Sequence, residues 1–135
     1  MGSFLIYIGV GLGGMFGSLL RYFISVGANN YLSEFFPFGT LFANLAGSLF
    51  LGWFTSKVAV QNTMNPVLRT AIGTGMVGSF TTFSTFNLES LALIETGRIV
   101  AAIFYILTSA VGGLLLAGAG YYLGSNKVLC GEASR

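Results

Sequence analysis

The sequence contains no histidine, a single cysteine and very few charged residues. Without histidine the usual pairing of a nucleophile with a base is missing, and no two acids are placed as a catalytic dyad, so we expect no enzyme. Cys130 has no partner for a disulfide within the chain. Zinc and iron–sulfur sites likewise lack their usual ligands. The six lysines and arginines are scattered, which predicts no nucleic-acid-binding surface.

Apolar residues dominate what is present. The chain is 54% hydrophobic and 7% charged, whereas an ordinary soluble domain is about 25% charged. At about 20 residues for each transmembrane helix, the 135 residues have room for four spans and little else. The sequence therefore predicts an all-α membrane protein with one membrane domain, 1–135, in the cell (inner) membrane. The expected spans are 4–27, 38–58, 67–95 and 99–124, followed by a polar tail at 125–135.

The third apolar segment contains a polar run that lipid would not tolerate in an ordinary span. The run is GSFTTFSTF at residues 78–86, in which five hydroxyl residues are interleaved with three phenylalanines. Polar groups and irregular backbone at membrane depth persist only where they are buried in protein or line a cavity. We therefore expect the third helix to be broken near 75–82, with Asn65 as its N-cap and Pro66 as its first residue. Two half-helices that meet at mid-membrane would direct free backbone groups at one spot, as at an ion site.

Asn44 lies in the middle of the second expected span. A carboxamide at that depth must find partners, and its NH₂ group can donate to an anion. One interpretation is therefore that Asn44 lines a pore. The alternative is an interhelical hydrogen bond that holds two helices together.

Phe83 and Phe86 are three residues apart, so they share one face if the local backbone is helical. A phenyl ring has a negative face and a positive edge, so ring edges can surround an anion without a fixed charge. Phenylalanines in membrane helices more often face lipid or the protein core. Here the neighbouring hydroxyls and glycines favour a role in an anion pathway.

Further polar residues could extend this pathway. Tyr105 and Ser109 are four residues apart in the fourth span and could form a polar track beside Ser84 and Thr85, unless their hydroxyls bond back to helix carbonyls. Arg21, at the end of the first span, either reaches the lipid headgroups or attracts anions in a water-filled vestibule. Glu89 is expected to be a paired or water-exposed acid.

Small residues recur at four-residue spacing in the first two spans. Gly9, Gly13 and Gly17 form one row, and Gly39, Ala43 and Gly47 form another. Such rows let helix backbones approach closely, either within one chain or between two copies. Four spans are hardly enough to enclose a permeation path, which favours an oligomer. If both ends share a side, that side holds Lys57, Arg69, Lys127 and Arg135, and the opposite side holds Arg21 and Arg98. Arg135 lies at the distal end of the tail, so the positive-inside rule gives only a weak lean and orientation is weakly encoded.

Three sequence motifs together resemble the Fluc (CrcB) family of fluoride channels. They are GGMFGSLLRY at residues 13–22, Asn44 within NLAGS, and TTFSTF at residues 81–86, and the match extends over all four spans. The resemblance implies an antiparallel, dual-topology homodimer in the lipid bilayer that conducts fluoride passively and lowers its cytoplasmic concentration. The chain departs from the family pattern at Ser79, where glycine is common, and at Gly113, where some members have a further serine on the polar track.

The resemblance also implies roles for individual residues. The implied fluoride pathway comprises Asn44, Phe83, Phe86, Ser84, Thr85, Tyr105 and Ser109, with Arg21 in the vestibule. A central structural sodium ion would be held by the main-chain carbonyls of Gly78 and Thr81.

Two other classes of protein fit the sequence less well. A small proton-coupled exporter of the multidrug type would need a carboxylate deep in the first span, and residues 4–27 contain no Asp or Glu. A non-transporting membrane assembly subunit would need only small-residue packing, and it would gain nothing from a broken helix.

Overall fold

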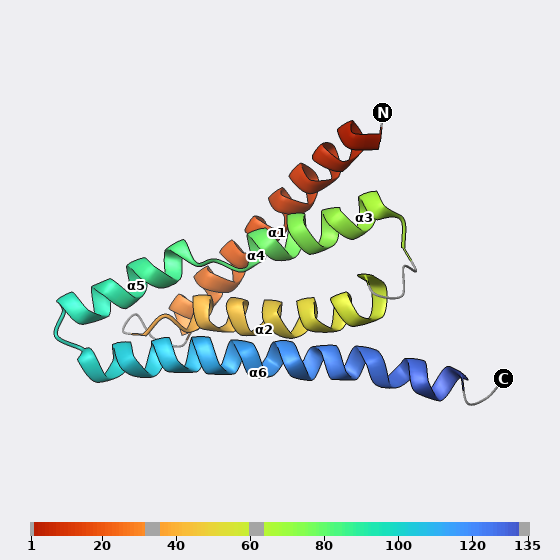
Figure 1. Ribbon diagram of the computed structural model, residues 1–135. Coiled ribbons are helices and arrows are strands. Elements are labelled where there is room, and N and C mark those ends of the chain that lie inside the picture. The colour runs from red at the N-terminus through yellow and green to blue at the C-terminus, as the bar shows by residue number, and fades with distance from the viewer. Residues whose placement is uncertain (1, 32–35, 60–63, 133–135) are drawn as a thin grey trace.

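The computed structural model describes residues 2–31, 36–59 and 64–132, and every regular element in these ranges is helical. Four helical segments follow one another along the chain (Figure 1). The first is α1 (Gly2–Tyr31), and the second is α2 (Phe38–Phe54), which continues as the π-helix η1 (Thr55–Ala59). The third comprises α3 (Pro66–Thr70), the π-helix η2 (Ala71–Val77), α4 (Gly78–Phe80) and α5 (Ser84–Glu95). The fourth is α6 (Ile99–Glu132), which continues past residue 124 through the polar segment.

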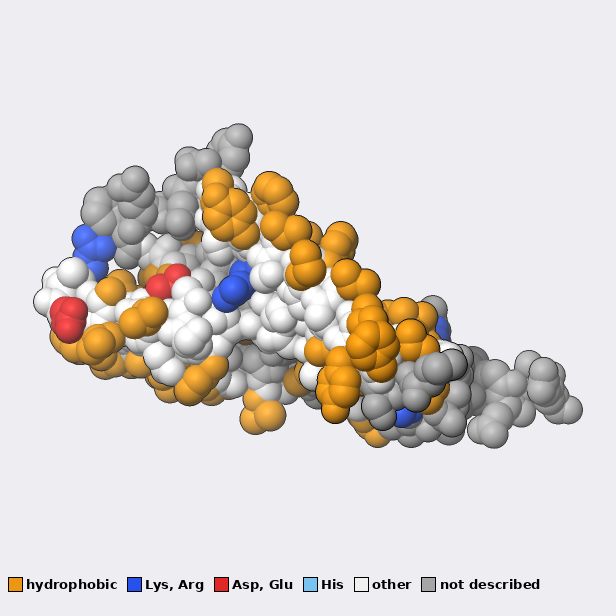
Figure 2. All heavy atoms as spheres, turned by 90° about the horizontal axis from the view of Figure 1, so that it is seen from above, with side chains coloured by type: hydrophobic (Ala, Val, Ile, Leu, Met, Phe, Trp, Pro, Cys, Tyr) orange, Lys and Arg blue, Asp and Glu red, His pale blue; other side chains and the backbone are white. Residues whose placement is uncertain are grey.

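Three of these segments are long and apolar enough to cross a membrane: Phe4–Ala28, Phe38–Val58 and Ile99–Ser125. Only 6% of the most apolar window of the first span and 11% of that of the last are buried within the chain. Hydrophobic side chains are therefore spread along the surface, with few charged ones among them, as Figure 2 shows for one face. Such a surface suits lipid or another protein and not water.

The third segment begins as its sequence predicts and is then interrupted. Asn65 Oδ1 accepts a hydrogen bond from the Val67 amide at 2.9 Å, and Pro66 occupies the first turn, so the expected cap is confirmed. Helical structure then continues to Phe80, where Thr81 turns to an extended conformation (φ −78°, ψ 155°). Helix α5 starts at Ser84. Because no single helix in this segment is long, it is not among the three candidate spans.

Close backbone contacts hold α1 against the third segment. A Cβ on Gly13 would collide with the carbonyl oxygen of Ala71, and one on Gly17 would collide with that of Met76. The contacts advance together along both segments, so the two run in parallel. The first row of small residues is therefore used within the chain, which is the first of the two alternatives left open by the sequence.

Helices α2 and α6 form a second parallel pair, and they lie side by side in Figure 1. A Cβ on Gly112 would lie 3.1 Å from the Leu45 side chain, one on Gly52 would collide with the carbonyl oxygen of Ala117, and one on Gly124 would lie 2.8 Å from Ser56 Cβ. These contacts advance together along both helices. In the second small-residue row, Gly39 packs on Ser25 of α1, and Gly47 faces the Thr81 side chain. The small residues of this row thus let α2 pack closely against both α1 and the interruption.

A small core forms where α5 turns back into α6. Gly97 adopts φ +75° and accommodates the turn, in which the Gly97 amide bonds the Ile94 carbonyl and the Arg98 amide bonds that of Leu93. Leu93 packs here against Tyr105 of α6, which is fully buried. Phe86 packs against the same cluster. The core thus fixes one side of the interrupted region.

Gly13→Ala is expected to destabilise the protein by about 1–3 kcal/mol, the usual cost of forcing atoms into a filled space. Gly11→Ala is the matched control, because nothing lies within 4 Å of a Cβ built at that position. The loss can be measured as the fraction of detergent-solubilised protein that stays monodisperse on heating. Equal losses in the two variants would contradict the proposed backbone contact.

Candidate functional site

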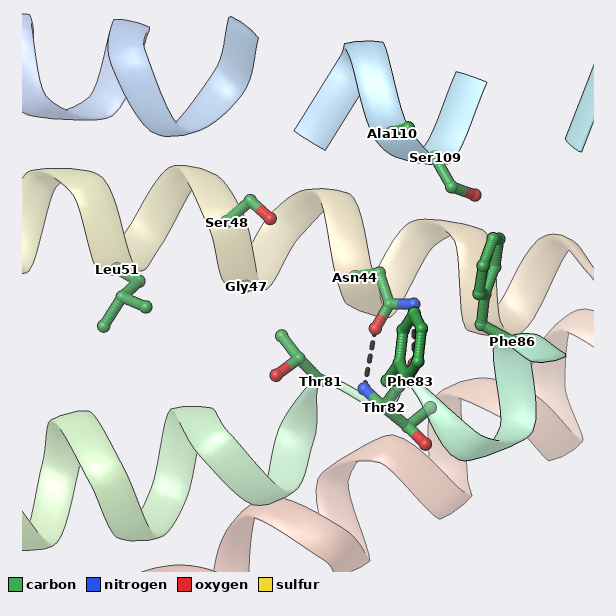
Figure 3. Close-up of a pocket in the computed structure, with 10 residues that line it drawn as sticks. All are labelled: Asn44, Gly47, Ser48, Leu51, Thr81, Thr82, Phe83, Phe86, Ser109 and Ala110. Carbon is green, nitrogen blue, oxygen red and sulfur yellow. Dashed lines mark hydrogen bonds between the residues drawn. The ribbon is translucent and has the colours of Figure 1, made fainter. Parts of the chain in front are cut away.

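The interrupted segment is joined to α2 by the side chain of Asn44. Asn44 Nδ2 donates to the Thr82 carbonyl at 3.0 Å, and Asn44 Oδ1 accepts from the Thr82 amide at 2.8 Å (Figure 3). One carboxamide thus satisfies both backbone groups of a residue outside the helices. The hydrogen bond between helical segments, one of the two alternatives that the sequence left for Asn44, is therefore present. One of the two Nδ2 hydrogens remains to donate elsewhere.

The interruption redirects two backbone amides away from their helical carbonyl partners. In a continued α-helix the Thr82 amide would bond the Gly78 carbonyl, and the Thr85 amide would bond the Thr81 carbonyl. Here the Thr82 amide bonds Asn44 Oδ1, and the Thr85 amide bonds Thr82 Oγ1 at 3.3 Å. The carbonyls of Gly78 and Thr81 therefore lose the amide partners that a continuous helix would supply.

Hydroxyls cluster at the start of α5. Thr82 Oγ1 lies 3.1 Å from Thr85 Oγ1 and 3.4 Å from Ser84 Oγ. Arg21 Nη1 donates to Thr85 Oγ1 at 3.5 Å. Arg21 is partly buried, so it lies against the interrupted segment and its guanidinium is directed at this hydroxyl cluster.

Three aromatic rings follow one another from the surface to the core. The rings of Phe83 and Phe86 are stacked with centroids 5.9 Å apart, and those of Phe86 and Tyr105 are tilted with centroids 5.2 Å apart. Phe83 is 75% exposed, whereas Tyr105 is fully buried. Phe83 therefore stands open on one side of the chain.

A pocket of about 360 Å³ lies between α2, the interrupted segment and α6. Its lining brings together four residues of the expected pathway, Asn44, Phe83, Phe86 and Ser109 (Figure 3). Ser109 Oγ is buried and has no hydrogen-bond partner among the residues that the structure describes. Thr81 and Ser48 also line this pocket.

The other expected residues lie beside the pocket and do not line it. Ser84 and Thr85 belong to the hydroxyl cluster with Arg21, and Tyr105 lies behind Phe86 in the core. Gly78 is in α4, one helical turn before Thr82. Thr81 faces the pocket, and its hydroxyl donates to the Val77 carbonyl at 3.1 Å.

The structure adds a hydrogen-bonded group centred on Glu89. Thr40 Oγ1 donates to Glu89 Oε1 at 2.8 Å, and the Tyr105 hydroxyl donates to Glu89 Oε2 at 2.7 Å. Both oxygens of the Glu89 carboxylate thus have hydrogen-bond donors. A paired acid is one of the two alternatives that the sequence left open. Thr40 escaped sequence reasoning because its contact with Glu89 spans 49 positions. The only available signal was that a carboxylate in an apolar segment requires donors.

These features define a class of protein. The helices and their exposed apolar surface are those of a multi-pass membrane protein, and its polar residues gather at one interrupted helix. Residues 8–121 match the family model described as "CrcB-like protein, Camphor Resistance (CrcB)". The chain therefore belongs to the CrcB family, as the sequence motifs predict.

Individual relatives support this assignment. The chain is 43% identical over 120 residues to "Fluoride-specific ion channel FluC 1" of Bacillus thuringiensis subsp. konkukian, a match that covers 89% of this chain and 88% of the relative. It is 44% identical over 117 residues to "Fluoride-specific ion channel FluC 2" of Geobacillus kaustophilus, covering 87% and 91%. It is 46% identical over 107 residues to "Fluoride-specific ion channel FluC 1" of Desulfitobacterium hafniense, covering 79% and 92%.

Glu89→Ala is expected to lower the stability by about 1–3 kcal/mol, because it leaves two hydroxyls without their acceptor. Those hydroxyls belong to Thr40 and Tyr105, which are 3% and 0% exposed. Glu89→Gln should retain most of the stability, since its amide can both accept from and donate to a hydroxyl. Thermal denaturation of the solubilised protein measures the stability of both variants. Glu95→Ala is the control, because Glu95 is an exposed acid of the same helix. Equal stability of Glu89→Ala and the unmodified protein would exclude this role.

Proposed function

We propose that this chain is a passive fluoride-specific ion channel. The observation that carries the proposal is the pocket beside the interrupted helix, in which an amide, two phenyl rings and a serine hydroxyl meet. The relatives' names specify fluoride, and the pocket offers the groups that a small anion requires.

The pocket lining includes two phenyl rings and several neutral polar side chains, and none of its ten residues is charged. Asn44 keeps one N–H, Ser109 Oγ has no hydrogen-bond partner among the described residues, and Phe83 and Phe86 line the same space. A small anion can bind such groups and leave them again, because none carries a full positive charge. Glu89 is the acid of α5 nearest the interruption in sequence. Both of its carboxylate oxygens already accept hydrogen bonds from hydroxyls. Those donors offset the repulsion that a bare carboxylate would exert.

We further propose that the channel is an antiparallel, dual-topology homodimer. One chain leaves Phe83 75% exposed, so a second copy would be needed to close the route around this ring. The six positive charges give only a weak preference for one orientation, which is compatible with insertion in both directions. A C-terminal tag should then be cleaved by external protease in only part of the chains in right-side-out vesicles. Cleavage of all chains, or of none, would contradict dual topology.

A central sodium ion is proposed at the interruption, which we place at mid-membrane. The carbonyls of Gly78 and Thr81 would hold it, since their helical amide partners are directed to Asn44 Oδ1 and Thr82 Oγ1. Across a two-fold axis these carbonyls would be doubled and could replace much of the ion's hydration shell. Within the described part of the chain no cluster of acidic, cysteine or histidine side chains is placed to hold a metal. Main-chain oxygens without such acids suit a monovalent ion better than a divalent one.

The function is tested by fluoride efflux from proteoliposomes. A fluoride electrode should record rapid, passive release from vesicles that contain the protein, and vesicles loaded with chloride should release far less. Equal release of the two anions would contradict fluoride specificity. No release of either would exclude a channel.

Phe83→Ile and Phe86→Ile should each reduce fluoride efflux by about tenfold or more, the factor that ~1.4 kcal/mol represents. Isoleucine is apolar and of similar bulk but lacks the positive ring edge. Phe83→Ile should leave stability nearly unchanged, because that ring is largely exposed. Phe4→Ile, at an exposed phenylalanine far from the pocket, is the control. Unchanged efflux in both pocket variants would remove the rings from the mechanism.

Asn44→Asp should abolish fluoride efflux in the fraction of the protein that still assembles. The carboxylate has no N–H to offer an anion, and its second oxygen would face the Thr82 carbonyl, which now lies 3.0 Å from Nδ2. Size-exclusion chromatography before reconstitution separates a loss of conduction from a loss of folding. Normal efflux through the variant at neutral pH would place Asn44 off the pathway.

Sodium should stabilise the dimer. The midpoint of thermal denaturation is expected to rise with the logarithm of the sodium concentration above the dissociation constant, as for any ligand of the folded state alone. Potassium and N-methylglucamine at equal ionic strength are the controls. The same midpoint in all three salts would argue against a structural sodium ion.

A further inference from the structure

Ser48 lines the pocket, yet neither the sequence motifs nor the proposed route gives it a role. Ser48 lies four residues after Asn44 in α2, so both side chains project from the same face of the helix. Both line the pocket, and Ser48 is partly buried there (Figure 3). A route that passes Asn44 along α2 would reach Ser48 next.

Opposite Ser48, helix α6 presents a glycine. A Cβ built on Gly113 would lie 3.5 Å from Ser48 Oγ, which is an ordinary van der Waals distance. The Ser48 hydroxyl therefore lies beside the bare backbone of α6 in a space that a short side chain from either helix could fill. One turn further along both helices the backbones are in contact, since a Cβ on Gly52 would collide with the Ala117 carbonyl.

Ser109 shows that this part of the pocket needs a polar occupant. It lies one turn before Gly113 on α6, and its buried Oγ has no partner in the part of the chain that is described. A buried hydroxyl without a hydrogen bond is costly, so rotation of the Ser109 side chain toward a water or an ion in the pocket would be favourable. Any such occupant can meet the Ser48 hydroxyl as it moves along the α2–α6 contact.

We propose that Ser48 extends the anion route beyond Ser109 by donating its hydroxyl hydrogen to fluoride in the space beside Gly113. This inference rests on the proposed fluoride channel. A serine hydroxyl suits the task because it rotates freely and offers one donor without a fixed charge. The route then uses the Asn44 amide and the Ser48 hydroxyl of α2 and the Ser109 hydroxyl of α6. At its end the hydroxyl comes from α2, because α6 has a glycine there and no side chain.

The test moves the hydroxyl from one helix to the other. Ser48→Ala should reduce fluoride efflux by about tenfold, the order expected for one lost hydrogen bond to an anion. Adding Gly113→Ser should restore most of the efflux, because a serine at position 113 would place its hydroxyl in the space that Ser48 Oγ leaves. Each variant is checked for assembly by size-exclusion chromatography before reconstitution.

Ser18→Ala is the matched control. It makes the same chemical change, but Ser18 Oγ bonds the carbonyls of its own helix at 2.9 and 3.0 Å and does not line the pocket. We expect its efflux to equal that of the unmodified protein.

A second pair of variants decides the matter if the double variant does not assemble. Ser48→Thr keeps the hydroxyl and should keep the efflux, whereas Ser48→Val has the same shape without the hydroxyl and should lose it. Efflux that is unchanged in Ser48→Ala, or a loss that an assembled Gly113→Ser double variant does not reverse, overturns the role of Ser48. So does equal efflux in Ser48→Thr and Ser48→Val.

The two proposals can fail separately. If the unmodified protein releases no fluoride, the proposed function itself is wrong. If it releases fluoride and Ser48→Ala does so equally well, only the role of Ser48 is wrong.

Discussion

The bidentate pairing of Asn44 with Thr82 is the interaction on which the interrupted helix depends. Lipid offers no partners to a free amide or carbonyl, so each residue outside a helix within a bilayer costs several kcal/mol unless protein replaces the lost hydrogen bonds. Asn44 replaces both bonds of Thr82 with one side chain. The interruption can therefore exist without water, and the amide that stabilises it stands beside the pocket.

That pairing requires α2 and the third segment to approach closely, and glycines make the approach possible. Gly47, one turn after Ala43 on α2, lies so near Thr81 that any Cβ would collide with the threonine methyl. On the other side, a Cβ on Gly14 would lie 3.1 Å from Ser79 Oγ. The interruption is thus held between α1 and α2 by small residues on both, and helices in lipid rely on such packing because they lack a hydrophobic drive to associate.

The sequence predicted the parts of this arrangement that depend on neighbours along the chain. The Asn65–Pro66 cap and the helical segments follow from local patterns, and the polar run of residues 78–86 marks the region of the interruption. Contacts between distant residues could not be predicted in the same way. Periodicity places Thr40 and Tyr105 on helix faces but does not say that both bond Glu89, because that depends on how α2, α5 and α6 pack. Asn44 left two alternatives open for the same reason.

The position of Arg21 shows how charge is kept beside the pocket and not within it. Its guanidinium reaches Thr85 Oγ1, and Thr85 is joined to Thr82, yet neither Arg21 nor Thr85 lines the pocket. A full positive charge at the binding groups would hold a small anion too tightly for rapid release, whereas neutral donors compensate for only part of its hydration. Conduction requires binding that is strong enough for entry and weak enough for exit. In the proposed channel, Arg21 would therefore supply positive potential to the approach, while no charged residue lines the pocket itself.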